Sequence, residues 1–580
     1  MLKSDLKYYF SERLIEIFDN STLDSYRVRV NNTLTLLIEA RDTINGRIED
    51  RIKSFLTVRP CLEELVISLK QDNCLTYTLC NKEKTIQLIR DFIGKDDNQR
   101  EEFTKYPFIL FIINRLIRDS QTTYLSNLFQ HITDILTDNS PLEEDKFEQI
   151  VNRLDLYILS MGCQLINNGY SKTFLFYKAK ELSQNCDFIN GFNLFKNECL
   201  VSKKKNYYVV LKVNISERAF RTGEVSDFTK EIDDENIIKY LSNYSYLQSY
   251  IKGTKHSRFY ISKESALDEY SAMKNAAESL ATVLDQINLG MTSLKATALE
   301  QGLAVSKNYN GHYSHKYGKY YRFDGKYFDD IKQVVVLQDC IKIINSNAKI
   351  KDDVKDRLTS AFRHLRIANY SMELEEKFLN YWIALEFLFS SPLSNETTFE
   401  RLKNNLSNIL YCCYAKRNLE YLNDILHKKG IIRNNEDFWK KSNGELDNLI
   451  ISQTSMLIKY RLIRLKNHFL TNEKQRRDYM EQHLCNLRQH ITRIYRLRNE
   501  LVHEAAIKQS IENMTSNLRY YLVFTLNQML SYFSTEPTQG YTMDDFFNEY
   551  KLLKIKLSQE NNLTANDLIN IPLEHRLLIS

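Results

Sequence analysis

Arg498, Asn499 and His503, near the carboxyl end of the chain, are the residues whose types and spacing best suit chemistry on a phosphate ester. Histidine transfers protons near neutral pH because its unperturbed pKa lies in that range. Arginine stays charged, and its planar fork binds two phosphate oxygens. RNA supplies its own nucleophile, the 2′-OH, so these side chains could cleave it without a metal. The predicted products are a 2′,3′-cyclic phosphate or 3′-phosphate and a 5′-OH, and DNA should not be cut.

A single helix over residues 487–503 is expected to position these side chains. Apolar residues recur there at spacings of three, four and seven, which indicates a buried stripe: Leu484, Leu487, Ile491, Ile494 and Leu501. At about 100° per residue, Asn499 and His503 share a face, whereas Arg498 and His503 lie about 140° apart. Either the helix is distorted near Val502, or an Arg and a His from two copies of the chain form one site.

The same region concentrates positive charge. The whole chain has a formal net charge of +5, whereas the segment from Met456 to His503 holds eleven Lys or Arg and four acids. We predict that Arg493 and Arg496 bind flanking RNA phosphates. The alternatives are that they are solvated, as charge runs usually are, or that they pair with acids such as Glu500.

Length and composition indicate a helical protein of two to four domains. Of 580 residues, 43% are hydrophobic and 26% charged, and 15 Gly and 6 Pro favour long helices. The ten cysteines form no CxxC pair, which fits reduced thiols in a cytoplasmic protein. The amino terminus has no signal-type apolar core, and the apolar run at 106–114 is too short to span a bilayer. We therefore expect no membrane partner.

The predicted fold class is mainly α with a small central α+β domain. Residues 1–195 are expected to form a helical sensor or scaffold, with breaks at Arg59-Pro60, at 94–98 and at 138–141. Residues 200–335 are expected to form the α+β domain, with strands at 207–213 and 257–261, a helix from about Lys263 to Gly290 and a hairpin turn at Asp324-Gly325. Helices over 357–370, 374–389 and 514–532, together with the motif helix, should form a four-helix-type bundle.

A metal site is not expected. His312 and His315 lie three residues apart in a Tyr- and Gly-rich stretch, but no third ligand cluster lies nearby. The interleaved Tyr and Lys there could stack on bases. An ordinary surface loop is the default interpretation, and no cofactor is predicted.

Three segments in order resemble the HEPN superfamily, specifically its Apea-like branch. They are Trp382-Ile-Ala-Leu-Glu386 with Phe387-Leu-Phe389, then Arg496-Leu-Arg498-Asn499-Glu-Leu-Val-His503, then Leu518-Arg-Tyr-Tyr-Leu522. The Arg-x4-His pattern alone is weak, and the flanking segments make it more specific. The resemblance covers residues 350–535, and residues 536–580 would form a C-terminal helical tail.

The resemblance implies an α-helical bundle that forms a homodimer through the HEPN domain, with the Arg-x4-His segments of two copies facing each other. It implies a metal-independent endoribonuclease of prokaryotic antiviral defence, abortive infection or toxin systems, with Arg498, Asn499 and His503 as catalytic residues. By the same analogy the RNA substrate could be a tRNA, since unstacked loop bases are accessible. A phage-encoded trigger or a partner from a neighbouring gene would activate it.

Other interpretations stay open. Some HEPN proteins are inactive and serve as RNA-binding or protein-binding modules, and the basic helix would suit that role equally well. A helical scaffold whose HEPN portion only dimerises is a further alternative. Glu386 is expected to pack or to pair with an arginine, not to act in proton transfer.

Overall fold

We describe the fold from a computed structural model of the chain, in which two compact units are distinguished. The structure describes residues 2–19, 31–94, 103–201, 203–214, 228–229, 257–290, 297–306, 312–316, 331–371, 373–391, 396–504, 511–535, 540–560 and 563–569. The first unit combines Met1–Cys163 with Phe323–Ser580, and the second is Gln164–Arg322. The sequence predicted 1–195 and 350–535 as separate regions, whereas the first 163 residues share a compact unit with the carboxyl-terminal helices.

The amino-terminal part of the first unit is helical throughout its described residues. Polar side chains begin several of these helices: Asn32, Ser54 and Asn81 each accept a hydrogen bond from a backbone N–H of the first turn. The elements are η1 (Lys3–Asp5), α1 (Leu6–Phe18), α2 (Thr33–Ile48), α3 (Phe55–Gln71), α4 (Lys82–Ile93), η3 (Phe103–Lys105), α5 (Tyr106–Ser120), α6 (Tyr124–Thr137) and α7 (Glu144–Asn167). The predicted breaks near 94 and 138 are confirmed, because α4 ends at Ile93 and α6 at Thr137.

The predicted break at Arg59-Pro60 is wrong, because Pro60 lies inside α3. Proline lacks the N–H that would bond the carbonyl four residues earlier, and its ring crowds that turn. The helix continues because α3 buries an apolar stripe at helical spacing: Val58, Cys61, Leu62, Leu65, Val66 and Leu69. Packing of that stripe outweighs the loss of one backbone hydrogen bond.

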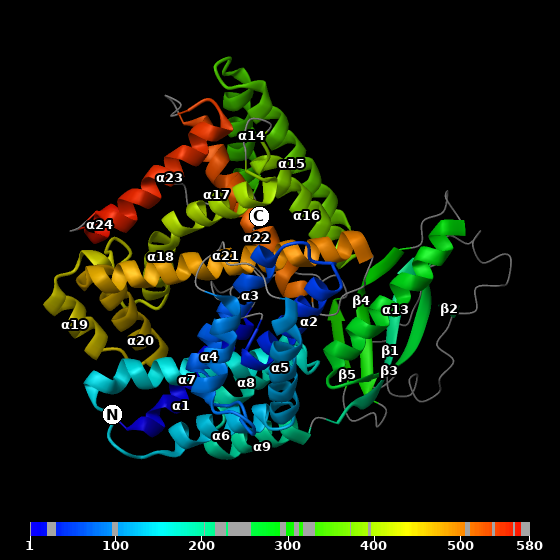
Figure 1. The fold of residues 1–580 in the computed structure, drawn as a ribbon, viewed down its shortest axis with the longest axis vertical. Coiled ribbons are helices and arrows are strands. Elements are labelled where there is room, and N and C mark those ends of the chain that lie inside the picture. The colour runs from blue at the N-terminus through cyan, green and yellow to red at the C-terminus, as the bar shows by residue number, and fades with distance from the viewer. Residues whose placement is uncertain are drawn as a thin grey trace. The chain divides into compact units, whose positions relative to one another are not determined.

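The carboxyl-terminal part of the unit is a larger helical assembly (Figure 1). Its elements are α14 (Ile331–Ser346), α15 (Asp352–Tyr370), α16 (Leu374–Phe389), α17 (Thr398–Cys412), α18 (Tyr414–Lys428), η5 (Phe438–Lys440), α19 (Asn443–Ile451), α20 (Met456–Leu465), the π-helix η6 (Lys466–Thr471), α21 (Glu473–Glu504), α22 (Glu512–Ser534), α23 (Met543–Gln559) and α24 (Ala565–Ile569). Helix α16 packs against α15, α17, α21 and α22, so these helices form one bundle. Nearly every side chain of α22 from Met514 to Phe533 is buried, which makes α22 its central helix.

Amino-terminal helices contact this assembly through polar groups as well as apolar packing. The Glu12 carboxylate of α1 accepts from Ser455 Oγ (2.9 Å) and from the backbone N–H of Leu457 (3.0 Å), where it meets the first turn of α20. One turn further along each helix, Arg461 Nη2 pairs with Glu16 at 2.7 Å. Helix α3 contacts α21 in the same unit. These contacts explain why residues 1–163 do not form a unit of their own.

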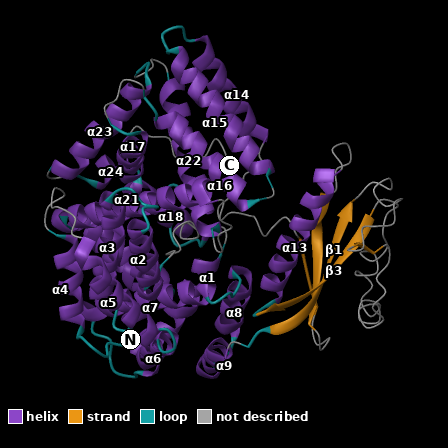
Figure 2. Ribbon diagram, turned by 45° about the vertical axis from the view of Figure 1, so that its right-hand side comes forward, coloured by secondary structure: helices purple, strands orange, loops and turns teal. Residues whose placement is uncertain are grey.

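The second unit contains a five-stranded antiparallel sheet with α13 (Glu269–Gly290) along one face (Figure 2). The strand order is β2-β3-β1-β4-β5, with β1 (Lys205–Asn214), β2 (Phe228–Thr229), β3 (Ser257–Ala266), β4 (Thr297–Ser306) and β5 (His312–Lys316), and α8 (Lys172–Gln184) and α9 (Phe188–Val201) complete the unit. Buried residues of β1 and α13 form its core, including Val209, Leu211, Met273 and Leu280.

The mainly α fold class with a small α+β region is therefore confirmed. Strands were predicted at 207–213 and 257–261, and both exist as β1 and β3. The helix was predicted to start near Lys263, which is wrong because β3 continues to Ala266 and α13 begins at Glu269. Asp268 sets that boundary: its Oδ1 accepts from the backbone N–H groups of Tyr270 and Ser271 at 2.9 Å each. The predicted turn at Asp324-Gly325 lies outside the described residues.

The α13 face of the sheet leaves no room for a side chain at Gly302 of β4. A Cβ there would lie 2.6 Å from Leu211 Cδ2 and 3.1 Å from Met273 Sδ. We expect Gly302→Ala to destabilise the second unit by about 1–3 kcal/mol through overpacking, and amide hydrogen exchange in β1 would measure the loss. Gly444→Ala in α19 is the matched control: no atom lies within 4 Å of its Cβ position, so exchange in β1 should stay at the wild-type rate. Equal protection of β1 in Gly302→Ala and wild type would contradict the prediction.

Among the described residues, no helix is long and apolar enough to cross a membrane. All ten cysteines are free, and most of them are buried.

Candidate functional site on helix α21

The predicted motif helix is present, and it is longer than expected. Helix α21 runs from Glu473 to Glu504 and begins where Asn472 Oδ1 accepts from the backbone N–H of Gln475 at 3.0 Å. The predicted apolar stripe is buried throughout: Leu484, Leu487, Ile491, Ile494 and Leu501. Tyr495 fixes the helix against the bundle, because its ring stacks on Phe399 at 3.9 Å between centroids and lies 5.9 Å from Trp382.

Arg498 and Asn499 lie together near the end of α21. Arg498 Nη1 donates to Asn499 Oδ1 at 3.1 Å, and Arg498 Nη2 lies 3.6 Å from a carboxylate oxygen of Glu386 on α16. The side chains of Arg498 and Glu386 are each 27% exposed. The structure therefore joins the Trp382–Glu386 segment to the Arg-x4-His segment, and Glu386 pairs with an arginine as expected.

His503 lies in the last turn of α21, and its side chain is outside the described residues. The helix is uninterrupted α-helix through Val502, so the predicted distortion near that residue is not found. The separation of about 140° between positions 498 and 503 therefore stands. The sequence offered a site shared between two copies of the chain as the other alternative, and that alternative stays a prediction.

Three exposed apolar side chains lie within one helical turn, along the chain, of Glu386 or Arg498. Ile383 and Phe387 of α16 are 38% and 47% exposed, and they lie one turn apart on the helix that carries Glu386. Val502 is 47% exposed and lies one turn beyond Arg498 on α21. Large apolar groups beside a partly exposed ion pair are typical of a surface that contacts another protein chain.

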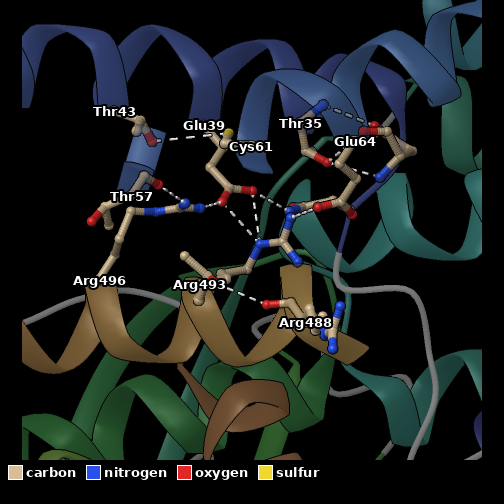
Figure 3. A network of polar contacts seen from close by, with 12 residues as sticks. Thr35, Glu39, Thr43, Thr57, Cys61, Glu64, Arg488, Arg493 and Arg496 are labelled. Carbon is tan, nitrogen blue, oxygen red and sulfur yellow. Dashed lines mark hydrogen bonds and ion pairs between the residues drawn. The ribbon is translucent and has the colours of Figure 1, made fainter. Parts of the chain in front are cut away.

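Arg493 and Arg496, the two arginines predicted to bind RNA, lie in an internal network with amino-terminal acids (Figure 3). Arg493 Nε lies 2.9 Å from both carboxylate oxygens of Glu39 on α2, and its Nη2 donates to Glu64 on α3. Arg496 Nη2 donates to Glu39, and its Nη1 donates to the Thr57 carbonyl at 3.0 Å. Both arginine side chains are less than 10% exposed. In this conformation the guanidinium groups are already paired, although not with Glu500.

The charges in this network stabilise one another against burial. Burial alone would raise the pKa of Glu39, but Arg493 and Arg496 together lower it below its ordinary value. Burial opposes the charge of Arg493, whereas Glu39 and Glu64 raise its pKa. Burial, together with the charge of Glu39, raises the pKa of the neighbouring Cys61 thiol to about 12, although the two arginines lower it. Glu39 and Arg493 are therefore charged at neutral pH.

Sequence reasoning did not identify Glu39, Glu64 or Thr57 as partners of α21. The only feature of the sequence that indicates such partners is the excess of positive charge in residues 456–503. It predicts that acidic residues pair with this segment, but it does not identify them. Thr57 lies in the first turn of α3, and its carbonyl accepts a hydrogen bond from Arg496.

Comparison of the chain with protein-family models, with curated proteins and with solved structures finds no match. The resemblance to HEPN proteins therefore stays a prediction carried by the residues alone. His312 and His315 lie in β5, opposite Val305 and Gly302 of β4, so residues 312–316 form a strand where the sequence predicted a loop. Among the side chains that the structure describes, no group of three or more His, Cys, Asp or Glu could hold a metal ion.

His490, one turn before Arg493, adds a pH-sensitive group to the buried face of α21. Its Nδ1 lies 3.0 Å from the Tyr521 hydroxyl of α22, and the two atoms share a hydrogen bond. Burial, together with the charge of Arg493, lowers the pKa of His490 to about 3. The folded ring therefore stays neutral at pH values where the unfolded ring, with a pKa near 6.5, takes up a proton.

We expect this histidine to make the protein less stable in acid. Between pH 6.5 and 3 the unfolded state binds more protons than the folded state, so stability falls as pH falls. At pH 5 the contribution is about 2 kcal/mol, and His490→Gln should remove most of it. Urea unfolding at pH 7.5 and pH 5 would measure the difference for the wild type and the variant. An identical pH dependence in the two proteins would contradict the prediction.

Proposed function

We propose that the protein is a metal-independent endoribonuclease in which Arg498, Asn499 and His503 act on RNA. The observation that carries the proposal is the arrangement at the end of α21. An arginine and an asparagine lie in contact on a partly exposed turn, one turn before a histidine on an unbroken helix. The resemblance to Apea-like HEPN proteins supports the same interpretation.

In this mechanism the His503 imidazole takes the proton from the 2′-OH or gives one to the 5′-leaving oxygen. Arg498 stabilises the charge that develops on the phosphorane, and Asn499 positions the Arg498 fork through its side-chain oxygen. Glu386 neutralises Arg498 before RNA binds, so phosphate has to compete with that carboxylate. The reaction yields a 2′,3′-cyclic phosphate and a 5′-OH.

We further propose that a second copy of the chain completes the site. The separation of Arg498 and His503 around the helix and the exposed Ile383, Phe387 and Val502 support a homodimer in which Arg498 of one copy faces His503 of the other. By analogy with the resembling family, the setting would be antiviral defence in a prokaryotic cytoplasm, with tRNA as a candidate substrate and a phage-encoded trigger or a neighbouring gene product as activator.

A non-catalytic role in binding RNA or protein is the second candidate, and the Arg498–Glu386 ion pair favours it. An arginine that is paired with a carboxylate can stabilise a binding interface without taking part in a reaction. The activity test is incubation of the purified protein with total RNA in EDTA, followed by mapping of the new ends. Fragments with 5′-OH ends, absent when the RNA is replaced by DNA of the same sequence, support the nuclease. Intact RNA at protein concentrations that bind it supports the second candidate.

A further inference from the structure

The network on the buried side of α21 has the composition of an occupied phosphate-binding surface. We define the carboxylate clamp as Glu39 and Glu64 together with the Thr57 carbonyl, which engage Arg493 and Arg496 (Figure 3). Glu39 presents both oxygens to Arg493 and one of them also to Arg496, so one carboxylate bridges two guanidinium groups. The two negative charges of the clamp balance the two positive charges of α21.

Arginine forks bind carboxylates and phosphates with the same bidentate geometry. Arg493 and Arg496 lie three residues apart, so their side chains emerge on one face of α21 as neighbours. Arg496 in turn lies two residues before Arg498. At about 100° per residue, Arg496 lies about 160° around α21 from Arg498, so an RNA strand bound at Arg498 would have to pass around the helix to meet these two cations.

Folding alone gives little reason for ion pairs at these positions. The other buried residues of α21 are five leucines and isoleucines and Met480, together with the polar Arg476, Gln489 and Thr492. Well-packed apolar residues are often as stabilising as buried ion pairs. The acids that neutralise α20 and α21 come repeatedly from the amino-terminal helices: Glu16 pairs with Arg461, and Glu39 and Glu64 pair with the two clamp arginines. Carboxylates of the amino-terminal helices therefore pair with arginines of both α20 and α21.

We propose that the carboxylate clamp is an internal substitute for RNA phosphates, which masks a second RNA-contacting surface on α21. In this state α2 and α3 cover Arg493 and Arg496, and RNA reaches only the Arg498 end of the helix. Displacement of the clamp by the RNA backbone extends the binding surface around α21, to the side that carries Arg493 and Arg496. This inference rests on the proposed interaction with RNA, and it assigns the amino-terminal helices a restraining role.

The test compares the double variant Glu39→Gln/Glu64→Gln with a control that removes two acids outside the clamp. The control is Glu49→Gln/Glu63→Gln, since Glu49 and Glu63 pair with Arg51 and Arg59 near the surface. Binding of a fluorescent single-stranded RNA is measured at several salt concentrations. We expect the clamp variant to bind at least about tenfold more tightly, with a salt slope steeper by about 1.4 for two additional phosphate contacts. The control should stay within about twofold of the wild type.

Wild-type affinity in the clamp variant, or an equal gain in the control, would overturn the proposal. Circular dichroism and thermal melting establish whether each variant is folded. If the double variant does not fold, the RNA affinity of the single variant Glu64→Gln is measured in its place. This variant is expected to fold, because Glu39 still bridges both arginines in it. A gain of about threefold or more in RNA affinity supports the clamp, and an unchanged affinity overturns it.

The same measurements separate this inference from the proposed nuclease activity. If the clamp variant binds RNA more tightly but no protein cleaves RNA, the masking role of the clamp is supported and the nuclease activity is contradicted. Cleavage by the wild type that depends on Arg498 and His503, with unchanged affinity and rate in the clamp variant, upholds the nuclease and removes the clamp.

Discussion

His503→Ala is expected to reduce RNA cleavage by a factor of about 100 to 10,000, because general acid–base catalysis by a positioned histidine contributes a factor of that size. Arg498→Ala should cost at least about 100-fold, since it removes the cation that faces the developing phosphorane charge. The measurement is the single-turnover rate on a defined RNA in EDTA. Both variants should keep the RNA affinity of the wild type within several-fold.

Arg488→Ala is the matched control for the arginine variant. Arg488 is an exposed arginine on the same helix, ten residues before the motif, and its replacement removes the same charge. We expect its single-turnover rate to stay within about twofold of the wild type. Equal losses in Arg488→Ala and Arg498→Ala would mean that α21 acts through its overall charge, and cleavage that persists in His503→Ala would remove the proposed chemistry.

A mixture of two inactive variants is expected to recover activity if the site is shared between copies. In a heterodimer of Arg498→Ala and His503→Ala, one of the two composite sites keeps both residues, because Arg498 comes from one copy and His503 from the other. Random re-association makes half of the dimers mixed, so the mixture should recover about a quarter of the wild-type rate. A mixture that stays as inactive as its components would contradict the shared site.

The interface itself is tested by Phe387→Asp, which places a charge among the exposed apolar side chains of α16. Arg498 and His503 remain intact in this variant. We expect a monomer by light scattering and a loss of cleavage comparable with that of His503→Ala. Tyr370→Asp is the control, because Tyr370 is 80% exposed at the end of α15 and outside the α16 surface. A monomeric Phe387→Asp variant with full activity would show that one copy suffices.

Local patterns predicted the elements that carry the candidate site, because those patterns depend on neighbours in the sequence. The three- and four-residue spacing of Leu484 to Leu501 is enough to predict a helix with one buried side. The β-branched and aromatic run at 207–213 is enough to predict a strand. The proline in α3 was misinterpreted because a proline signal is local, whereas the packing that keeps the helix intact involves the rest of the unit.

The partners of the basic helix could not be predicted in the same way. Glu39 and Arg493 are separated by 454 residues, and nothing in the spacing of either residue indicates the other. The positive excess in residues 456–503 was interpreted as a surface for RNA because charge usually faces solvent. The structure shows that the amino-terminal acids take up part of this charge. The folded arrangement, and not the charge count, decides which arginines remain accessible.

The continuity of α21 gives the chain a mechanical connection. A helix of 32 residues is roughly 48 Å long and behaves as a stiff rod. Its first turn is held where Arg476 Nη1 donates to the Leu563 carbonyl near α24, its middle is held by Glu39 and Glu64, and its last turns carry Arg498, Asn499 and His503. Because a hydrogen-bonded helix is stiff along its axis, we expect a displacement of α21 at either support to move the motif as well. The contacts of α21 with distant helices therefore help to set the position of Arg498.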